Sequence, residues 1–162
     1  MLRLSWVALC CCLLLMGCAS NEVSVSESEA ASSESQGQKL PITAEVEIGG
    51  ELIKLEVART PEEQAMGLMY REELAANRGM LFPLEPPRIP RFWMKNVEIP
   101  LDMIFISEGE VRAIAQDVPP CRETPCPTYG PDTVIDKVLE LRGGRAEELQ
   151  LEVGDSLSVE YK

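Results

Sequence analysis

The strongest constraint on the fold is a pair of alternating segments separated by two glycines. Residues 42–48 and 52–57 each alternate apolar and polar side chains, and Gly49-Gly50 lies between them. Alternation with a period of two is typical of a strand buried on one face, and a Gly-Gly connection allows the positive φ angles of a tight turn. The pattern therefore predicts a β-hairpin and places this region in an antiparallel sheet.

The rest of the folded part predicts more short strands and two or three short helices. Thr60-Pro61-Glu62-Glu63 is a capping box with proline at the first helical position, which predicts a helix over residues 61–66 that ends near Gly67. A second helical turn is expected over residues 71–76. We expect strands over residues 80–82, 91–95, 102–107, 110–115, 134–141 and 156–161, and a short helix over residues 145–149. The fold class is α+β, mostly β, as a curled sheet or partly closed barrel.

The first 18 residues have the pattern of an export signal. Arg3 precedes an apolar run of about a dozen residues, which is too short for a membrane span because a span takes roughly 20. Leu15-Met16-Gly17-Cys18 resembles the lipobox of bacterial lipoproteins. It predicts cleavage before Cys18 and attachment of diacylglyceryl and palmitoyl chains to that cysteine. The alternatives are an uncleaved anchor, or an ordinary signal peptide with a chance cysteine.

The segment over residues 21–39 is rich in serine and glutamate and contains no aromatic residue. Such a composition cannot bury enough apolar surface to offset its ordering entropy, so we expect a flexible tether. The expected organisation is a signal peptide over residues 1–17, the lipidated cysteine and tether over 18–39, and one domain over 40–162. Ala19 is not an aspartate, which favours the periplasmic side of the outer membrane if the cell is Gram-negative.

The charge and the missing histidine exclude several classes of function. The formal net charge is −12, so phosphates would be repelled and a nucleic-acid partner is not expected. The sequence has no histidine, which removes the commonest general base and the commonest metal ligand near neutral pH. A Ser-His-Asp triad is excluded, and no cofactor or metal is expected.

Several stretches together are similar to a known family. They are Gly67–Arg71 and Asn77–Phe82, then Phe92–Asp102 with Ile104-Phe105, and finally Val138–Leu141 with Gly143-Gly144 and Gly154-Asp155. This pattern, from about residue 42 to residue 160, resembles the prokaryotic family catalogued as domain of unknown function 192. The resemblance implies a small, mostly β domain that is often exported, and it implies no established activity. Val97 departs from the family pattern, where threonine is expected, so no hydroxyl at this position can belong to the site.

Two cysteines remain beside Cys18 after the predicted cleavage. Cys121 and Cys126 lie in a proline-rich stretch over residues 119–131 of a chain that we expect to be exported. This context favours a structural disulfide. Free thiols, a redox pair and a metal site are the alternatives, although two thiols without histidine do not complete a zinc site.

Methionines are frequent in the domain, at positions 66, 69, 80, 94 and 103. Thioethers can bind Cu(I), and two of them beside Trp93 could form a copper site. Methionine also fills irregular gaps in a hydrophobic core, and we favour that interpretation.

Gly143-Gly144 lies between Arg142 and Arg145 at the start of a predicted helix. Free N–H groups there could bind an anion. We favour a simple strand-to-helix turn that requires positive φ.

The stretch from Trp93 to Asp102 carries the candidate binding residues. In a strand, Trp93 and Lys95 would share one face, while Asn96 would lie on the other. Asp102 stands among apolar residues, so we expect its carboxylate to be buried and paired, with Lys95 or Asn96 as the partner. These groups form either a structural network or a ligand cleft with Trp93 as its wall.

Two classes of function remain after these exclusions. The first is a membrane-tethered, non-catalytic module that binds a small molecule, a glycan or a partner protein. The alternative is a hydrolase or lyase that acts on an envelope carbohydrate through paired carboxylates, for which Asp102 and Glu140 are the candidates. A copper carrier is a third and less favoured hypothesis.

Overall fold

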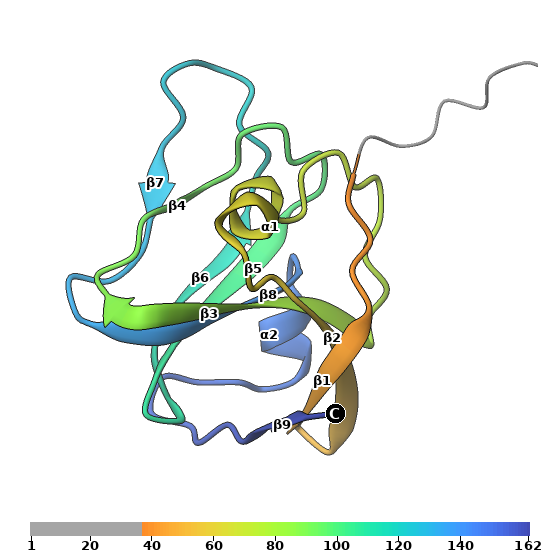
Figure 1. The fold of residues 1–162 in the computed structure, drawn as a ribbon, viewed down its shortest axis with the longest axis vertical. Helices are drawn as coiled ribbons and strands as arrows, with labels where there is room; N and C mark the ends of the chain where they lie inside the picture. The colour runs from red at the N-terminus through yellow and green to blue at the C-terminus, as the bar shows by residue number, and fades with distance from the viewer. Residues whose placement is uncertain (1–36) are drawn as a thin grey trace, which may run out of the picture. The chain divides into compact units, whose positions relative to one another are not determined.

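The computed structural model describes residues 37–162, and most of them belong to one seven-stranded sheet. The predicted signal peptide, Cys18 and most of the predicted tether lie outside the described residues. Among residues 37–162, no helix has the length and apolar character needed to cross a membrane. The elements are β1 Ile42–Ile48, β2 Glu51–Val57, α1 Pro61–Met66, β3 Arg78–Arg88, β4 Phe92–Trp93, β5 Leu101–Ser107, β6 Glu110–Val118, β7 Thr128–Tyr129, β8 Ile135–Arg142, α2 Arg145–Glu148 and β9 Val159–Tyr161 (Figure 1).

The strand order of the sheet is β6-β5-β8-β3-β2-β1-β9. The predicted hairpin of β1 and β2 is confirmed, with Glu45 opposite Lys54 and Ile48 opposite Glu51. All neighbours are antiparallel except β2 and β3, which run parallel because α1 and the following loop return the chain to the same end of the sheet. The strands β4 and β7 form a separate two-stranded sheet.

The large sheet curls but does not close. Its edge strands are β6 and β9, and the segment before β9 spans the opening between them. Ser156 forms an isolated bridge with Glu110, and the N–H of Leu157 donates to the carbonyl of Gly109 at 2.7 Å. The expectation of a mostly β fold with two short helices is therefore confirmed, and the sheet stays an open, curled one rather than a barrel.

The two faces of the sheet carry two separate hydrophobic cores. Ile104, Ile106 and Leu139 belong to the core on the concave face, which α2 covers through Ala146. The alternate residues of β5 and β8, such as Met103 and Val138, belong to the other core, which also contains Leu68 of the loop after α1. Figure 1 shows α1 and α2 on opposite sides of the sheet. Each central strand is thus buried on both faces, which explains its nearly continuous apolar sequence.

Several predicted elements differ from the structure. The strand expected over residues 80–82 extends over Arg78–Arg88, and the one expected over 156–161 is limited to Val159–Tyr161. Residues 71–76 form no helix, because Arg71 is drawn into an ion pair of 2.6 Å with Glu56 of β2, and tertiary contacts override the local preference. The strand expected over residues 91–95 is limited to Phe92–Trp93, since only these residues find a partner, in β7. The disulfide between Cys121 and Cys126 is present, with a Cα–Cα distance of 5.7 Å, in the loop that leads to β7.

Asp102 fastens three parts of the fold together. Its side chain is fully buried and lies on the concave face with Ile104. The carboxylate accepts hydrogen bonds from the backbone N–H groups of Asp117 at 2.7 Å, Gly144 at 3.1 Å and Ala146 at 2.6 Å. It therefore joins β5 to the end of β6 and to the start of α2, and it supplies the negative charge that the first N–H groups of a helix attract.

The Gly143-Gly144 turn combines the two properties considered for it, a strand-to-helix turn and an N–H group that contacts an anion. Gly144 has a φ of 76°, which a strand-to-helix turn needs and which glycine adopts without strain. Its N–H also contacts an anion, but that anion is the chain's own Asp102. The turn has no room for a side chain at Gly143, because a Cβ there would lie 2.7 Å from the Cβ of Pro100.

We predict that Asp102→Asn lowers the free energy of unfolding by about 3 kcal/mol, because an amide presents one acceptor oxygen where a carboxylate presents two. Chemical denaturation at neutral pH measures the loss. The matched control is Asp132→Asn, since the side chain of Asp132 is 91% exposed. A loss for Asp102→Asn no larger than that of the control would contradict the structural role.

Candidate functional site

The site is built around the loop that follows α1. The side chain of Thr60 accepts from the N–H of Glu63, and the Glu63 carboxylate accepts from the N–H of Thr60, so the predicted capping box is confirmed. The helix ends at Gly67, whose φ of 48° turns the chain back over the sheet. A Cβ at Gly67 would lie 3.4 Å from the ring of Phe82, which shows how closely this loop approaches β3.

Asn96 holds the far side of this loop. The N–H of Tyr70 donates to the carbonyl of Asn96 at 2.8 Å, and the Asn96 amide donates to the Tyr70 hydroxyl at 2.8 Å. Both residues have a left-handed backbone, with φ of 61° at Tyr70 and 56° at Asn96. Asparagine adopts this conformation readily, whereas a tyrosine in it costs free energy. The paired hydrogen bonds offset this cost and fix the loop against the segment after β4.

A small cavity of about 40 Å³ lies between the loop, β4 and the sheet. It has room for a few water molecules or for one functional group of a ligand. Glu140 of β8 lies at its buried end together with Leu68, Phe82 and Val97, whereas Trp93 is 48% exposed and lies at its mouth. The remaining lining residues are Gln64, Ala65, Met66, Gly67, Met69 and Phe92.

Glu140 is buried without a partner. It is 4% exposed, and the two residues opposite it on the neighbouring strands are Met80 of β3 and Met103 of β5, both fully buried. Within residues 37–162, no hydrogen bond or ion pair reaches its carboxyl group, and none of the other residues that line the cavity is charged. The carboxyl oxygens keep some contact with solvent, because the one fully enclosed side-chain polar atom without a partner in this part of the chain is Nε of Arg71. Burial raises the pKa of Glu140 to about 8, so the group is mostly a neutral acid at pH 7.

The predicted site residues separate into two locations. Trp93 lines the cavity, and the ammonium of Lys95 lies 5.3 Å from the centre of its indole ring. Asn96 positions the cavity wall through Tyr70. The expected pairing of Asp102 with Lys95 or Asn96 is wrong, because the alternation of β5 directs Asp102 to the opposite face, toward α2, where backbone N–H groups satisfy it.

Asp102 and Glu140 do not form a carboxylate pair. Asp102 lies opposite Leu141 and Glu140 lies opposite Met103, so the two acids are one position apart in register and point to opposite faces of the sheet. Acid–base hydrolysis of a glycoside needs both carboxyl groups on one substrate. The structure therefore does not bring together the residues on which the hydrolase hypothesis relied.

The methionines gather around Glu140 more closely than the sequence indicates. Met66 and Met69 line the cavity, and Met80 and Met103 flank the carboxyl group from the neighbouring strands. Met94 is buried in the same core. In the described part of the chain, no group of three or more cysteine, aspartate and glutamate side chains is arranged to hold a metal ion.

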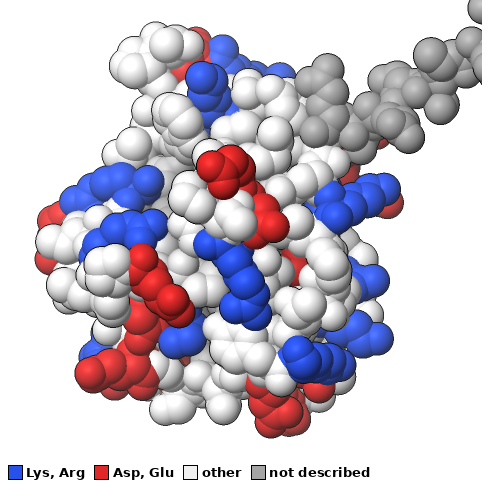
Figure 2. All heavy atoms as spheres, viewed as in Figure 1, with Lys and Arg blue, Asp and Glu red and all other residues white. Residues whose placement is uncertain are grey.

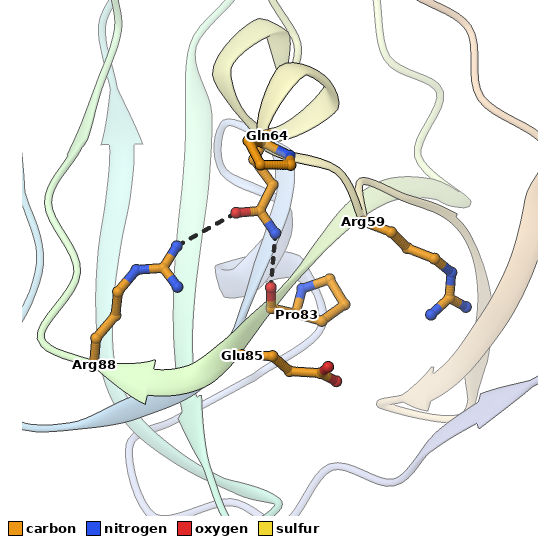
Figure 3. Close-up of a pocket in the computed structure, with 6 residues that line it drawn as sticks. Arg59, Gln64, Pro83, Glu85 and Arg88 are labelled. Atoms are coloured by element: carbon orange, nitrogen blue, oxygen red, sulfur yellow. Dashed lines mark hydrogen bonds between the residues drawn. The ribbon is translucent and has the colours of Figure 1, made fainter.

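Gln64 also lines a larger groove of about 400 Å³ (Figure 3). Its lining comprises Arg59, Pro61, Gln64, Pro83, Glu85 and Arg88. The Gln64 amide donates to the carbonyl of Pro83 at 2.7 Å and accepts from Arg88 at 3.3 Å. None of the lining residues is buried, so this groove is a feature of the solvated surface.

The sequence predicted Glu140 only as one member of a carboxylate pair, and it did not predict that the group would lack a hydrogen-bond partner. The signal was present in the sequence, because Glu140 stands between Leu139 and Leu141 as Asp102 stands between Leu101 and Met103. An acid in an apolar strand needs a partner or becomes neutral. The other lining residues from Gln64 to Met69 could not be found without the path of the loop after α1.

Glu140 predicts a specific dependence of stability on pH. Its pKa is raised from the ordinary value of 4.5 to about 8 on folding, so between these values the folded state holds a proton that the unfolded state has lost. The free energy of unfolding should therefore fall as the pH rises from 4.5 to 8, by up to about 1.4 kcal/mol per pH unit. Glu140→Gln should flatten this fall and should be more stable than the wild type at pH 8.

Urea denaturation at pH 5, 6.5 and 8 measures this effect. The matched control is Glu47→Gln, because Glu47 is an exposed residue of β1. Equal slopes for the wild type and Glu140→Gln would show that Glu140 does not keep its proton on folding.

Comparisons with known proteins agree with this architecture. The family DUF192, described as "Uncharacterized ACR", matches residues 44–159. No curated protein matches the chain. A crystal structure of a protein of unknown function from Novosphingobium aromaticivorans is 38% identical, with a TM-score of 0.64, over 72% of this chain and 83% of that one.

A second crystal structure, described as "a putative transcription regulator" from Sinorhizobium meliloti, is 31% identical. Its TM-score is 0.66, and the match covers 76% of this chain and 98% of that one. The family match covers most of the chain, and the resemblance found in the sequence is confirmed. The chain belongs to the DUF192 family.

Proposed function

We propose that this chain is a lipid-anchored envelope protein whose domain binds a small molecule in the Glu140 cavity and catalyses no reaction. One observation carries the binding function: Glu140, an acid that is 4% exposed and receives no hydrogen bond within residues 37–162, lines the same cavity as the half-exposed Trp93. Ligand sites are mostly apolar cavities with a few polar groups that converge on them. Glu140 is the acidic group of this cavity, and the chain's own hydrogen bonds leave it available to a ligand.

The size of the cavity limits what can enter it. A space of about 40 Å³ admits one functional group of a ligand rather than a whole sugar ring. The rest of the molecule would lie outside, against Trp93, whose ring is half exposed. Binding of this kind favours a small molecule over a glycan or a flat protein surface, since only a projecting group reaches Glu140.

The membrane anchor is supported by the sequence. The lipobox ends at Cys18, and the serine-rich and glutamate-rich segment that follows can hold the domain away from the membrane. Near the end of this segment, the Gln38 amide donates to the carbonyls of Glu63 and Gly67 at 2.8 and 3.0 Å. We place the protein on the periplasmic side of the outer membrane if the cell is Gram-negative.

A role in binding nucleic acid is not proposed, although one relative is described as a transcription regulator. The net charge of −12 would repel phosphates. On the face shown in Figure 2, acidic and basic side chains are interspersed, and the basic ones do not merge into a continuous patch.

The anchor makes a direct prediction. Mass spectrometry of the mature protein should show an acylated amino-terminal Cys18, and Cys18→Ser should release the protein from membranes, because the acyl chains are its attachment. Fractionation of cells after a carbonate wash measures the release. If the Cys18→Ser protein still sediments with membranes, the lipoprotein assignment is wrong.

The binding function predicts that small molecules stabilise the domain through Glu140. Thermal-shift screening should be run against small amines, alcohols, monosaccharides and carboxylates at neutral pH. At least one class should raise the melting temperature of the wild type and of Glu47→Gln but not of Glu140→Gln, since binding stabilises only the folded state. A screen in which no class distinguishes Glu140→Gln from the wild type would contradict binding at this cavity.

A further inference from the structure

We propose that the Glu140 cavity binds the head of a small organic ammonium ion, with Glu140 as its counter-charge and the aromatic side chains as its walls. The inference rests on the proposed binding function and names the chemical class of the ligand. Its geometric basis is a cavity lined by one carboxyl group, three aromatic rings and two thioethers, with no cationic residue in its lining.

The carboxyl group is the first part of the argument. Glu140 is 4% exposed, lines the cavity and has no hydrogen-bond or ion-pair partner among residues 37–162. An ammonium group that enters the cavity can donate an N–H to the carboxylate, and hydrogen bonds between ionised groups are among the strong ones. The burial that disfavours an unpaired carboxylate then favours the pair.

The walls are the second part. Phe82, Phe92 and Trp93 line the cavity, and the rings of Phe82 and Phe92 meet edge to face with centroids 5.2 Å apart. Aromatic faces attract cations, and cages of aromatic side chains recognise alkylated ammonium groups. Trp93 already shows this property, because the ammonium of Lys95 lies 5.3 Å from its ring centre.

The remaining lining supports a cation over an anion. Gln64, Met66, Met69 and Val97 are uncharged, so no basic group competes for Glu140 or would hold an anion in the cavity. The flanking residues of the adjacent strands are Met80 and Met103, which do not titrate. Lys95 is a charged residue beside the mouth of the cavity, where its ammonium contacts the ring of Trp93. The net charge of −12 also raises the concentration of cations near the protein.

The protonation of Glu140 predicts how the affinity of an ammonium ion depends on pH, and ligands of other charge should not show this dependence. Burial raises the pKa of the empty site to about 8, so an ammonium ion must displace a proton when it binds below that pH. Its affinity should therefore increase with pH, by up to about tenfold per unit from pH 6 to pH 8, and then level off. A neutral ligand that accepts a hydrogen bond from the protonated acid should bind with nearly constant affinity below that pKa and lose affinity above it.

The test uses the mature protein from Cys18 onward, in which Trp93 is the sole tryptophan and its fluorescence reports on the cavity. The probes are n-butylammonium, n-butanol and butyrate, which share one hydrocarbon tail and differ in charge. We expect n-butylammonium to bind at least about tenfold more tightly than n-butanol at pH 8, and butyrate not to bind. Glu140→Gln should weaken n-butylammonium binding about tenfold or more and remove its pH dependence, whereas Glu47→Gln should change neither.

Several outcomes would overturn the proposal. Equal affinities for n-butylammonium and n-butanol, or an affinity for the amine that falls from pH 6 to pH 8, would show that Glu140 acts as a neutral hydrogen-bond donor. Silver ions serve as a fourth probe, and a response to them without one to n-butylammonium would assign the site to a soft metal ion bound by Met66 and Met69. Binding of neutral compounds alone, lost in Glu140→Gln, would contradict the ammonium proposal but support the binding function. If no probe changes the fluorescence, the result would contradict the binding function as well.

Discussion

The carboxylate of Asp102 is the interaction on which the arrangement of the fold depends. It is fully buried, and its three hydrogen bonds come from the backbone N–H groups of Asp117, Gly144 and Ala146. These donors belong to the bulged end of β6, the turn after β8 and the first turn of α2. Without the carboxylate, buried N–H groups from three elements would lose their acceptor at once.

Glu140 lies on the neighbouring strand, and its surroundings are the opposite of those of Asp102. The register of β5 against β8 directs Asp102 to the concave face and Glu140 to the face covered by α1 and β4. Asp102 meets three donors, whereas Glu140 meets methionines and aromatic rings and keeps its proton. A buried acid whose oxygens accept hydrogen bonds stabilises a fold. An acid without such bonds beside a cavity lowers stability, which is a common property of functional sites. This contrast separates the structural carboxylate from the candidate ligand site.

Local sequence rules predicted much of the fold, because most of its elements depend on local chemistry. The hairpin followed from alternation and Gly49-Gly50, the first helix from the capping box at Thr60, and the disulfide from the prolines around Cys121 and Cys126. The pairing of β4 with β7 could not be predicted in this way. It joins segments about 35 residues apart, and no local pattern specifies their register.

The candidate site was predicted only in part for the same reason. The sequence placed Trp93 at a binding wall and identified Asp102 as a buried acid, but it could not say on which face of the sheet each would lie. The expected partners of Asp102, Lys95 and Asn96, were chosen by closeness in the chain. The structure shows that β5 turns Asp102 away from them, and that Asn96 instead fixes Tyr70 and the wall of the Glu140 cavity.

The most direct test of this account is the pKa of Glu140 itself, measured by NMR titration of its side-chain carboxyl carbon in the free protein and in the presence of n-butylammonium. The account predicts a pKa of about 8 in the free protein and a lower value when the amine is bound, because the ammonium stabilises the charged form. A pKa near the ordinary value of 4.5 in the free protein, unchanged by the amine, would contradict it.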